Sequence, residues 1–147
     1  METKATDVIA ITKLYELRRD DKMRAARAWY LNEFAPQNAQ DIVHIMLGGF
    51  AASEKFRMVT SYWDMAASFV NNGGLDEKLF VEANTEHLAV FSLIAPYLAE
   101  VRVIFNEPNY LKHLETLVMR IPDAEATLER RRQLFGRWRE TAAAAKG

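Results

Sequence analysis

The chain has 147 residues, 50% of them hydrophobic and 27% charged, a composition that fits one folded globular domain and excludes a disordered or fibrous chain. The formal net charge of −1 gives no overall field to attract nucleic acid or an anionic membrane, and the absence of cysteine excludes disulfides, thiol catalysis and cysteine-based zinc sites. Met1–Lys4 opens no apolar run of the kind that a signal peptide needs, and we expect no membrane span. We therefore predict a single helical domain over residues 1–147 in the cytoplasm. We expect neither a nucleic-acid nor a membrane partner.

Apolar residues recur at helical spacing in the first third of the chain and predict three helices. The first is expected near residues 7–18. The second opens at Asp20–Asp21, whose acidic side chains suit the positive end of the helix dipole. The third follows Asn38, with Asp41 placed to bond back to this cap, and it ends at Gly48–Gly49.

The fourth predicted helix, near residues 51–72, has the clearest pattern and ends at Gly73–Gly74. Its apolar residues cover an arc of about 200°, wider than a surface helix normally presents. We therefore expect this helix to lie in the middle of a bundle. The residues on this arc are Phe56, Val59, Tyr62, Trp63, Met65, Ala66, Phe69 and Val70.

The rest of the chain predicts four more helical segments. Asp76 caps a short helix, and a long helix near 85–106 should be kinked by Pro96, which removes a backbone hydrogen bond. Two further helices should begin at Pro108 and near Ala124. The predicted fold is therefore all-α, an irregular multi-helix bundle of six to eight helices.

Polar residues on the fourth helix suggest a ligand site. Arg57 and Asp64 lie two turns apart on one side, Trp63 flanks them, and Arg102 comes from the kinked helix. One interpretation is a buried polar pocket in which arginine receives an anion. The interpretation that we favour is an ion pair of Asp64 with a neighbouring helix, through Arg102 or Arg27.

Motifs for enzymatic chemistry are weak. The glycine pairs lack the spacing and the lysine of a phosphate-binding loop, and they suit helix ends better. Asp41 and His44 share a helix face, but a di-metal bundle needs a Glu-x-x-His on each of two helices and two further glutamates. We expect no metal and no cofactor.

The last predicted helix allows two interpretations. Its basic run, Arg130–Arg132 with Arg137 and Arg139, is interleaved with glutamates, which favours a solvated helix over a nucleic-acid surface. Its apolar stripe suits either the seam of a dimer or packing against the core. The residues of this stripe are Leu128, Leu134, Phe135 and Trp138.

An ordered set of motifs between Arg57 and Arg120 resembles the bacterial domain-of-unknown-function family 4760. The motifs are the segment Arg57–Asp64, the segment Phe69–Asp76, Leu79–Phe80, Pro96, Arg102, Tyr110 and Leu114–Leu117. This family has no established activity. The resemblance therefore implies a helical domain and nothing catalytic, and it directs attention to Arg57, Trp63, Asp64, Asp76 and Arg102.

The hypothesis that these observations favour is a non-enzymatic interaction domain that self-associates as a homo-oligomer or binds another protein through an apolar helix face. Two alternatives stay open: a small-molecule or anion-binding domain around Arg57, Asp64 and Arg102, and a metal-dependent enzyme using Asp41, His44 and a carboxylate from another helix. No motif in the sequence identifies a physiological partner or a ligand.

Overall fold

The computed structural model describes residues 5–49 and 51–146, which form helices joined by short turns and contain no strand. The elements are α1 (Ala5–Arg18), α2 (Asp21–Asn32), α3 (Ala39–Leu47), α4 (Ala51–Asn71), α5 (Glu77–Ala83), α6 (Glu86–Ile94), the 3-10 helix η1 (Ala95–Tyr97), α7 (Leu98–Phe105), α8 (Lys112–Met119) and α9 (Ala124–Lys146). The all-α prediction is confirmed. Counted with α6, η1 and α7 as one bent rod, these described residues hold eight helices, within the predicted range.

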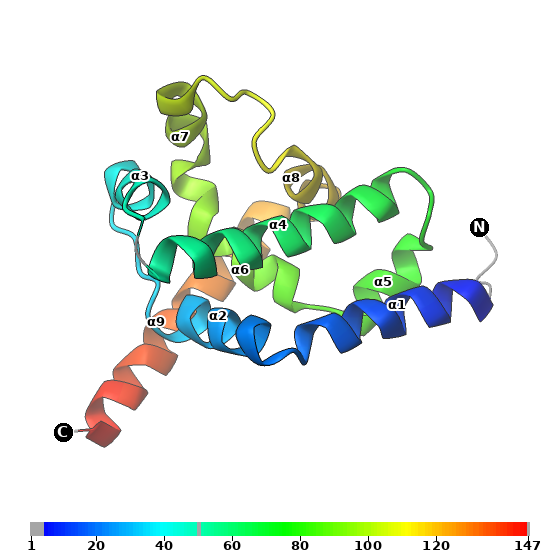
Figure 1. Cartoon of the computed structure of the whole chain (residues 1–147), viewed down its shortest axis with the longest axis horizontal. Helices are drawn as coiled ribbons and strands as arrows, with labels where there is room; N and C mark the ends of the chain where they lie inside the picture. Colours follow the sequence, from blue (N-terminus) through cyan, green and yellow to red (C-terminus); the bar gives the residue numbers. More distant parts are fainter. Residues whose placement is uncertain (1–4, 50, 147) are drawn as a thin grey trace.

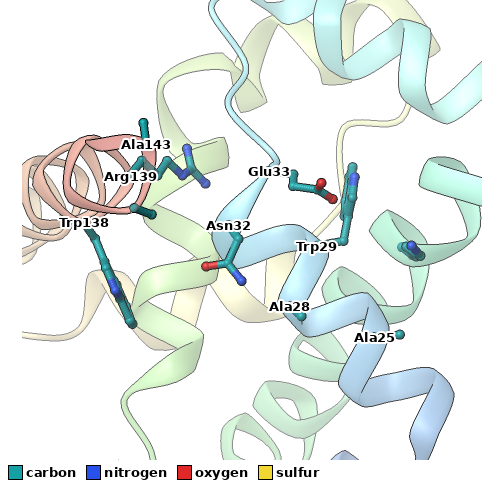
Figure 2. Close-up of a pocket in the computed structure, with 10 residues that line it drawn as sticks. Ala25, Ala28, Trp29, Asn32, Glu33, Trp138, Arg139 and Ala143 are labelled. Atoms are coloured by element: carbon teal, nitrogen blue, oxygen red, sulfur yellow. The ribbon is translucent and has the colours of Figure 1, made fainter. Parts of the chain in front are cut away.

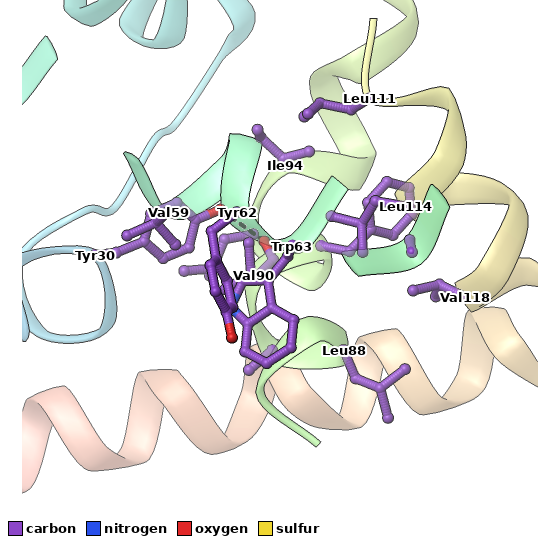
Figure 3. Packing of buried hydrophobic residues seen from close by; sticks show 14 of the residues in the cluster. Tyr30, Val59, Tyr62, Trp63, Leu88, Val90, Ile94, Leu111, Leu114 and Val118 are labelled. Carbon is purple, nitrogen blue, oxygen red and sulfur yellow. Dashed lines mark hydrogen bonds between the residues drawn. The ribbon is translucent and has the colours of Figure 1, made fainter. Parts of the chain in front are cut away.

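Helix α4 lies at the centre, as its wide apolar arc predicts (Figure 1). It packs against α2, α3, α5, α6 and α8, and Phe56 and Trp63 on it are almost completely buried. Figure 3 shows Trp63 among side chains from α6 and α8. In the same view the hydroxyl of Tyr30 donates to the carbonyl of Val90 at 2.6 Å, which ties α2 to α6 inside the core.

The apolar arc of α4 is narrower in the structure than in the prediction. Met65 and Phe69 are 39% and 44% exposed, because they lie at the edge of the arc, beyond the neighbouring helices. On α1, Val8, Leu14 and Tyr15 recur at helical spacing, but only Leu14 is buried, whereas Val8 and Tyr15 are about half exposed.

The predicted kink at Pro96 is present. Helix α6 ends at Ile94, η1 carries the proline, and α7 resumes at Leu98. The rod Glu86–Phe105 is nevertheless long and apolar enough to cross a membrane by composition, contrary to our expectation that no segment would be. In this fold residues 87–94 are all buried, so a place in the protein core accounts for their apolar character.

Side-chain caps begin several helices, among them the predicted cap at Asn38. Asp20 accepts from the backbone N–H groups of Lys22 and Met23, and Asn38 accepts from that of Asp41. Helix α8 differs from its prediction, since it begins at Lys112 rather than at Pro108. The residue before it, Leu111, has a left-handed backbone conformation with φ of 55°.

Candidate functional site

Asp64 and Arg102 both hold the start of α8 in place. Asp64 Oδ1 accepts the backbone N–H of Leu114 at 2.9 Å, and this bond explains why α8 begins later than its sequence predicts. Arg102 Nε donates to the carbonyl of Tyr110 at 2.9 Å, and its Nη1 lies 3.2 Å from a carboxylate oxygen of Glu115. The partners of Asp64 and Arg102 are thus on α8 and the turn before it, which argues against the ion pair that we favoured between them.

Trp63 points from a different side of α4, toward Glu86 at the start of α6. Its indole N–H donates to Glu86 at 3.1 Å. Arg27 on α2 binds the same carboxylate as a fork, with Nε and Nη2 at 2.9 Å and 2.8 Å from its two oxygens, and the hydrogen bond to Glu86 raises the pKa of Arg27. Glu86 therefore joins α2, α4 and α6.

The four residues predicted to bind a ligand do not meet at one site. Arg57 is exposed and its Nε donates to the carbonyl of Ser53 on its own helix. Asp64 and Arg102 face α8, whereas Trp63 faces Glu86. The five surface hollows described for this part of the chain are lined by none of the four.

The candidate metal ligands lie on α3. A side-chain oxygen of Asp41 accepts the backbone N–H of Gln37, one residue before Asn38, to which it was predicted to bond back. Within residues 5–49 and 51–146, no three histidine, aspartate or glutamate side chains are grouped so that they would hold a metal ion.

His87 is fully buried between the rings of Trp63 and Phe80. Neither of its ring nitrogens has a hydrogen-bond partner among the described residues. Burial lowers the pKa of His87 to about 4, with a smaller contribution from Arg131. The side chain is therefore a neutral core residue at neutral pH.

The apolar stripe of α9 is divided between two surroundings. Leu128 and Phe135 are 3% and 5% exposed, and α9 packs chiefly against α6. Leu134 and Trp138 are 53% and 58% exposed. Core packing therefore accounts for the first pair, and the second pair, called here the α9 strip, faces outward.

Arg132 fastens the middle of α9 to the bend in α6. Its Nη1 donates to the carbonyl of Ser92 at 2.9 Å. In a regular helix this carbonyl would accept from the residue four positions later, but that residue is Pro96, which has no N–H. The arginine thus satisfies a carbonyl that the proline leaves without its helical partner.

Arg139 makes a similar bond one heptad later, at the end of α2. Its Nη2 donates to the carbonyls of Tyr30 and Leu31 at 3.3 Å and 3.2 Å, and to that of Phe34 at 2.5 Å. The last carbonyls of a helix lack partners within it, and they form the negative end of its dipole. Burial lowers the pKa of Arg139.

Together these contacts define the docking face of α9. Its residues recur at the spacing of successive helical turns on one side of the helix: Leu128, Arg132, Phe135 and Arg139. Sequence reasoning assigned the two arginines to a solvated basic surface. The sequence did contain a signal for their true position. Both arginines are spaced so that they lie on the same side of the helix as Leu128 and Phe135, and a charged residue on the buried side of a helix faces the protein.

A hollow of about 770 Å³ lies between α2 and the end of α9. Figure 2 shows Trp138 on α9, Asn32 at the end of α2 and Glu33 directly after it, with Arg139 extending from α9 toward the end of α2. Small side chains on both helices also line it, namely Ala25, Ala28, Ala142 and Ala143. A second hollow of about 170 Å³ continues from Trp138 and Leu134 to Glu86.

The comparison with known protein families concerns the helices that precede α9, called here the body. Residues 3–121 match the model of a family described as "Domain of unknown function (DUF4760)". The chain belongs to this family. The DUF4760 match confirms the resemblance noted between Arg57 and Arg120 and extends it to the N-terminal helices. No curated protein and no solved structure matches the chain.

The DUF4760 match ends just before α9. Helix α9, at Ala124–Lys146, lies outside the matched residues, yet it covers part of α6 and binds the end of α2. The surface that α9 covers is therefore built by the matched part of the chain.

Proposed function

We propose that this DUF4760 chain is a non-enzymatic helical interaction domain that self-associates, and that the α9 strip is its contact surface. The observation that carries the proposal is the exposure of Leu134 and Trp138, 53% and 58%, one helical turn apart on a helix whose other large apolar residues, Leu128 and Phe135, are buried. Single exposed apolar residues are common in proteins, but a tryptophan and a leucine side by side form a patch.

The shape around the strip also supports a protein partner. Trp138 lines three of the hollows. Figure 1 shows the C-terminal end of α9 extending past the other helices. Tryptophan in a partly formed recess is typical of residues that dominate binding energy at protein interfaces.

Three arginines of α9 are held by contacts within the chain rather than left open to an anion. Arg132 and Arg139 donate to backbone carbonyls, and Arg130 donates to the side chain of Thr127 on the same helix. Three glutamates are interleaved with them. This arrangement supports a contact to protein rather than to nucleic acid.

The mass of the full chain in solution tests the proposal. Size-exclusion chromatography with light scattering should give a mass that rises with concentration from 16.9 kDa toward twice that value. The variant carrying Leu134→Glu and Trp138→Glu should remain a single chain at every concentration, because the new charges would be buried in the contact.

Val103→Glu is the matched control, since Val103 is 79% exposed on α7 and lies outside the α9 strip. This variant should associate like the unaltered chain. A mass of 16.9 kDa for the unaltered chain throughout the concentration range contradicts the proposal, and so does equal dissociation by the control.

A further inference from the structure

We propose that two copies of the chain exchange α9, so that the docking face of each α9 lies on α6 and α2 of the other copy. This inference rests on the proposed self-association and names the segment that passes between the copies. The occupant of the docking site is thus a second copy of the same helix.

The first argument is the complementarity between α9 and the body. The body offers two acceptor groups, the carbonyl of Ser92 beside Pro96 and the terminal carbonyls of α2. Helix α9 offers two arginines seven residues apart, with Phe135 buried between them. An α9 from a second copy carries the same residues and can make every one of these contacts.

The second argument is the short connection between α8 and α9. Helix α8 ends at Met119 and α9 begins at Ala124, and the connection contains Pro122. Asp123 has a φ of 57°, in the left-handed region, which aspartate adopts more readily than most residues but less readily than glycine. An extended connection would release this conformation, and short, constrained hinges favour exchange of terminal elements.

The third argument is the distribution of charge and of exposed apolar surface. Residues 120–147 carry a net charge of +3 and the rest of the chain carries −4, so α9 is attracted to the body of a second copy as it is to its own. An extended connection of four residues spans at most about 14 Å, which holds the two bodies side by side. The contact between the two bodies would cover the α9 strip, which is exposed in the single chain.

Chemical cross-linking distinguishes exchange from contact between intact copies. Thr85 and Arg131 line the same 170 Å³ hollow, from α6 and α9 respectively, and the chain has no natural cysteine. Thr85 makes no side-chain capping hydrogen bond, so its replacement should be tolerated. The double variant Thr85→Cys with Arg131→Cys is treated with a short bismaleimide and examined on a denaturing gel.

At concentrations where light scattering shows a dimer, exchange predicts that most cross-linked product contains two chains. Product of one chain, formed while the dimer persists, overturns the exchange and leaves the proposed self-association standing. A protein that stays monomeric at every concentration overturns both. Each single-cysteine variant should give little two-chain product.

A cysteine-free variant provides a second measurement. Six glycine and serine residues inserted between Pro122 and Asp123 let α9 reach its own body without strain, so exchange predicts at least a fivefold lower dimer fraction at equal concentration. An unchanged dimer fraction overturns the exchange, because contact between intact copies does not depend on the length of this connection.

Discussion

At the scale of single residues, two arginines hold α9 through backbone carbonyls rather than carboxylates. Arg132 donates to the carbonyl of Ser92, and Arg139 donates to carbonyls in and just after the last turn of α2. Hydrogen bonds from a charged donor are stronger than neutral ones, and a buried carbonyl left unpaired costs free energy. These bonds therefore fix the position of α9 along α6 and α2.

Arg132→Ala should lower the free energy of unfolding by about 1–3 kcal/mol, since the Ser92 carbonyl loses its donor. In the Pro96→Ala background the same change should cost less, because residue 96 then supplies a backbone N–H. Urea denaturation of the unaltered chain, the two single variants and the double variant gives the coupling free energy between Arg132 and Pro96. Arg130→Ala, at an exposed position on the same helix, should change stability by no more than about 0.5 kcal/mol. Equal losses in both backgrounds contradict the role assigned to Pro96.

His87 should make stability depend on pH. Its pKa is lowered to about 4 in the folded chain, whereas the unfolded chain keeps the ordinary value of 6.5. Between these values the unfolded state binds more protons, so stability is complete above pH 6.5 and falls as the pH drops toward 4. The loss should be about 3 kcal/mol at most.

His87→Phe should remove most of this loss, because phenylalanine suits the space between Trp63 and Phe80 and does not titrate. The exposed His113 provides the control, and His113→Gln should leave the loss in place. Thermal melting at pH 7.5 and pH 4.5 measures it. A pH dependence unchanged by His87→Phe would assign the effect to other groups.

At the scale of elements, Glu86 links three helices. It accepts from Arg27 on α2 and from Trp63 on α4, and its side chain is 13% exposed. Breaking a partly buried pair leaves the remaining charge without compensation, unlike the loss of a surface pair.

Arg27→Met should therefore lower the free energy of unfolding by about 1–3 kcal/mol, with the indole of Trp63 left as the donor to Glu86. Lys78→Met breaks the surface pair with Glu82, where both side chains are more than half exposed, and should cost less than about 0.5 kcal/mol. Chemical denaturation compares the two. Similar costs would contradict the special position of Glu86.

How much of the fold could be predicted differs between elements. The central place of α4 and the bend at Pro96 follow from periodicity and from the chemistry of proline, which are properties of the local sequence. The start of α8 could not be predicted, because Asp64, fifty residues earlier, sets it by a tertiary hydrogen bond. Arg27 and Glu86 are likewise joined only by the packing of their helices.

At the scale of the whole molecule, the chain consists of two parts that bind each other: the body matched by the DUF4760 family, and α9. The body carries the negative charge, and α9 carries the positive charge together with the exposed tryptophan. The candidate interface was predicted from its stripe of four residues. Periodicity could not show which residues of this stripe are buried and which are exposed, because that depends on the angle at which the helix packs against the body.

The most direct test of self-association through α9 is amide hydrogen exchange of the full chain, measured at a low and a high concentration. We predict slower exchange at the high concentration in α9 between Leu134 and Ala145 and in the part of α2 that lines the large hollow, with no change in α5. Identical exchange along α9 at both concentrations, in a sample whose mass doubles, would contradict the account.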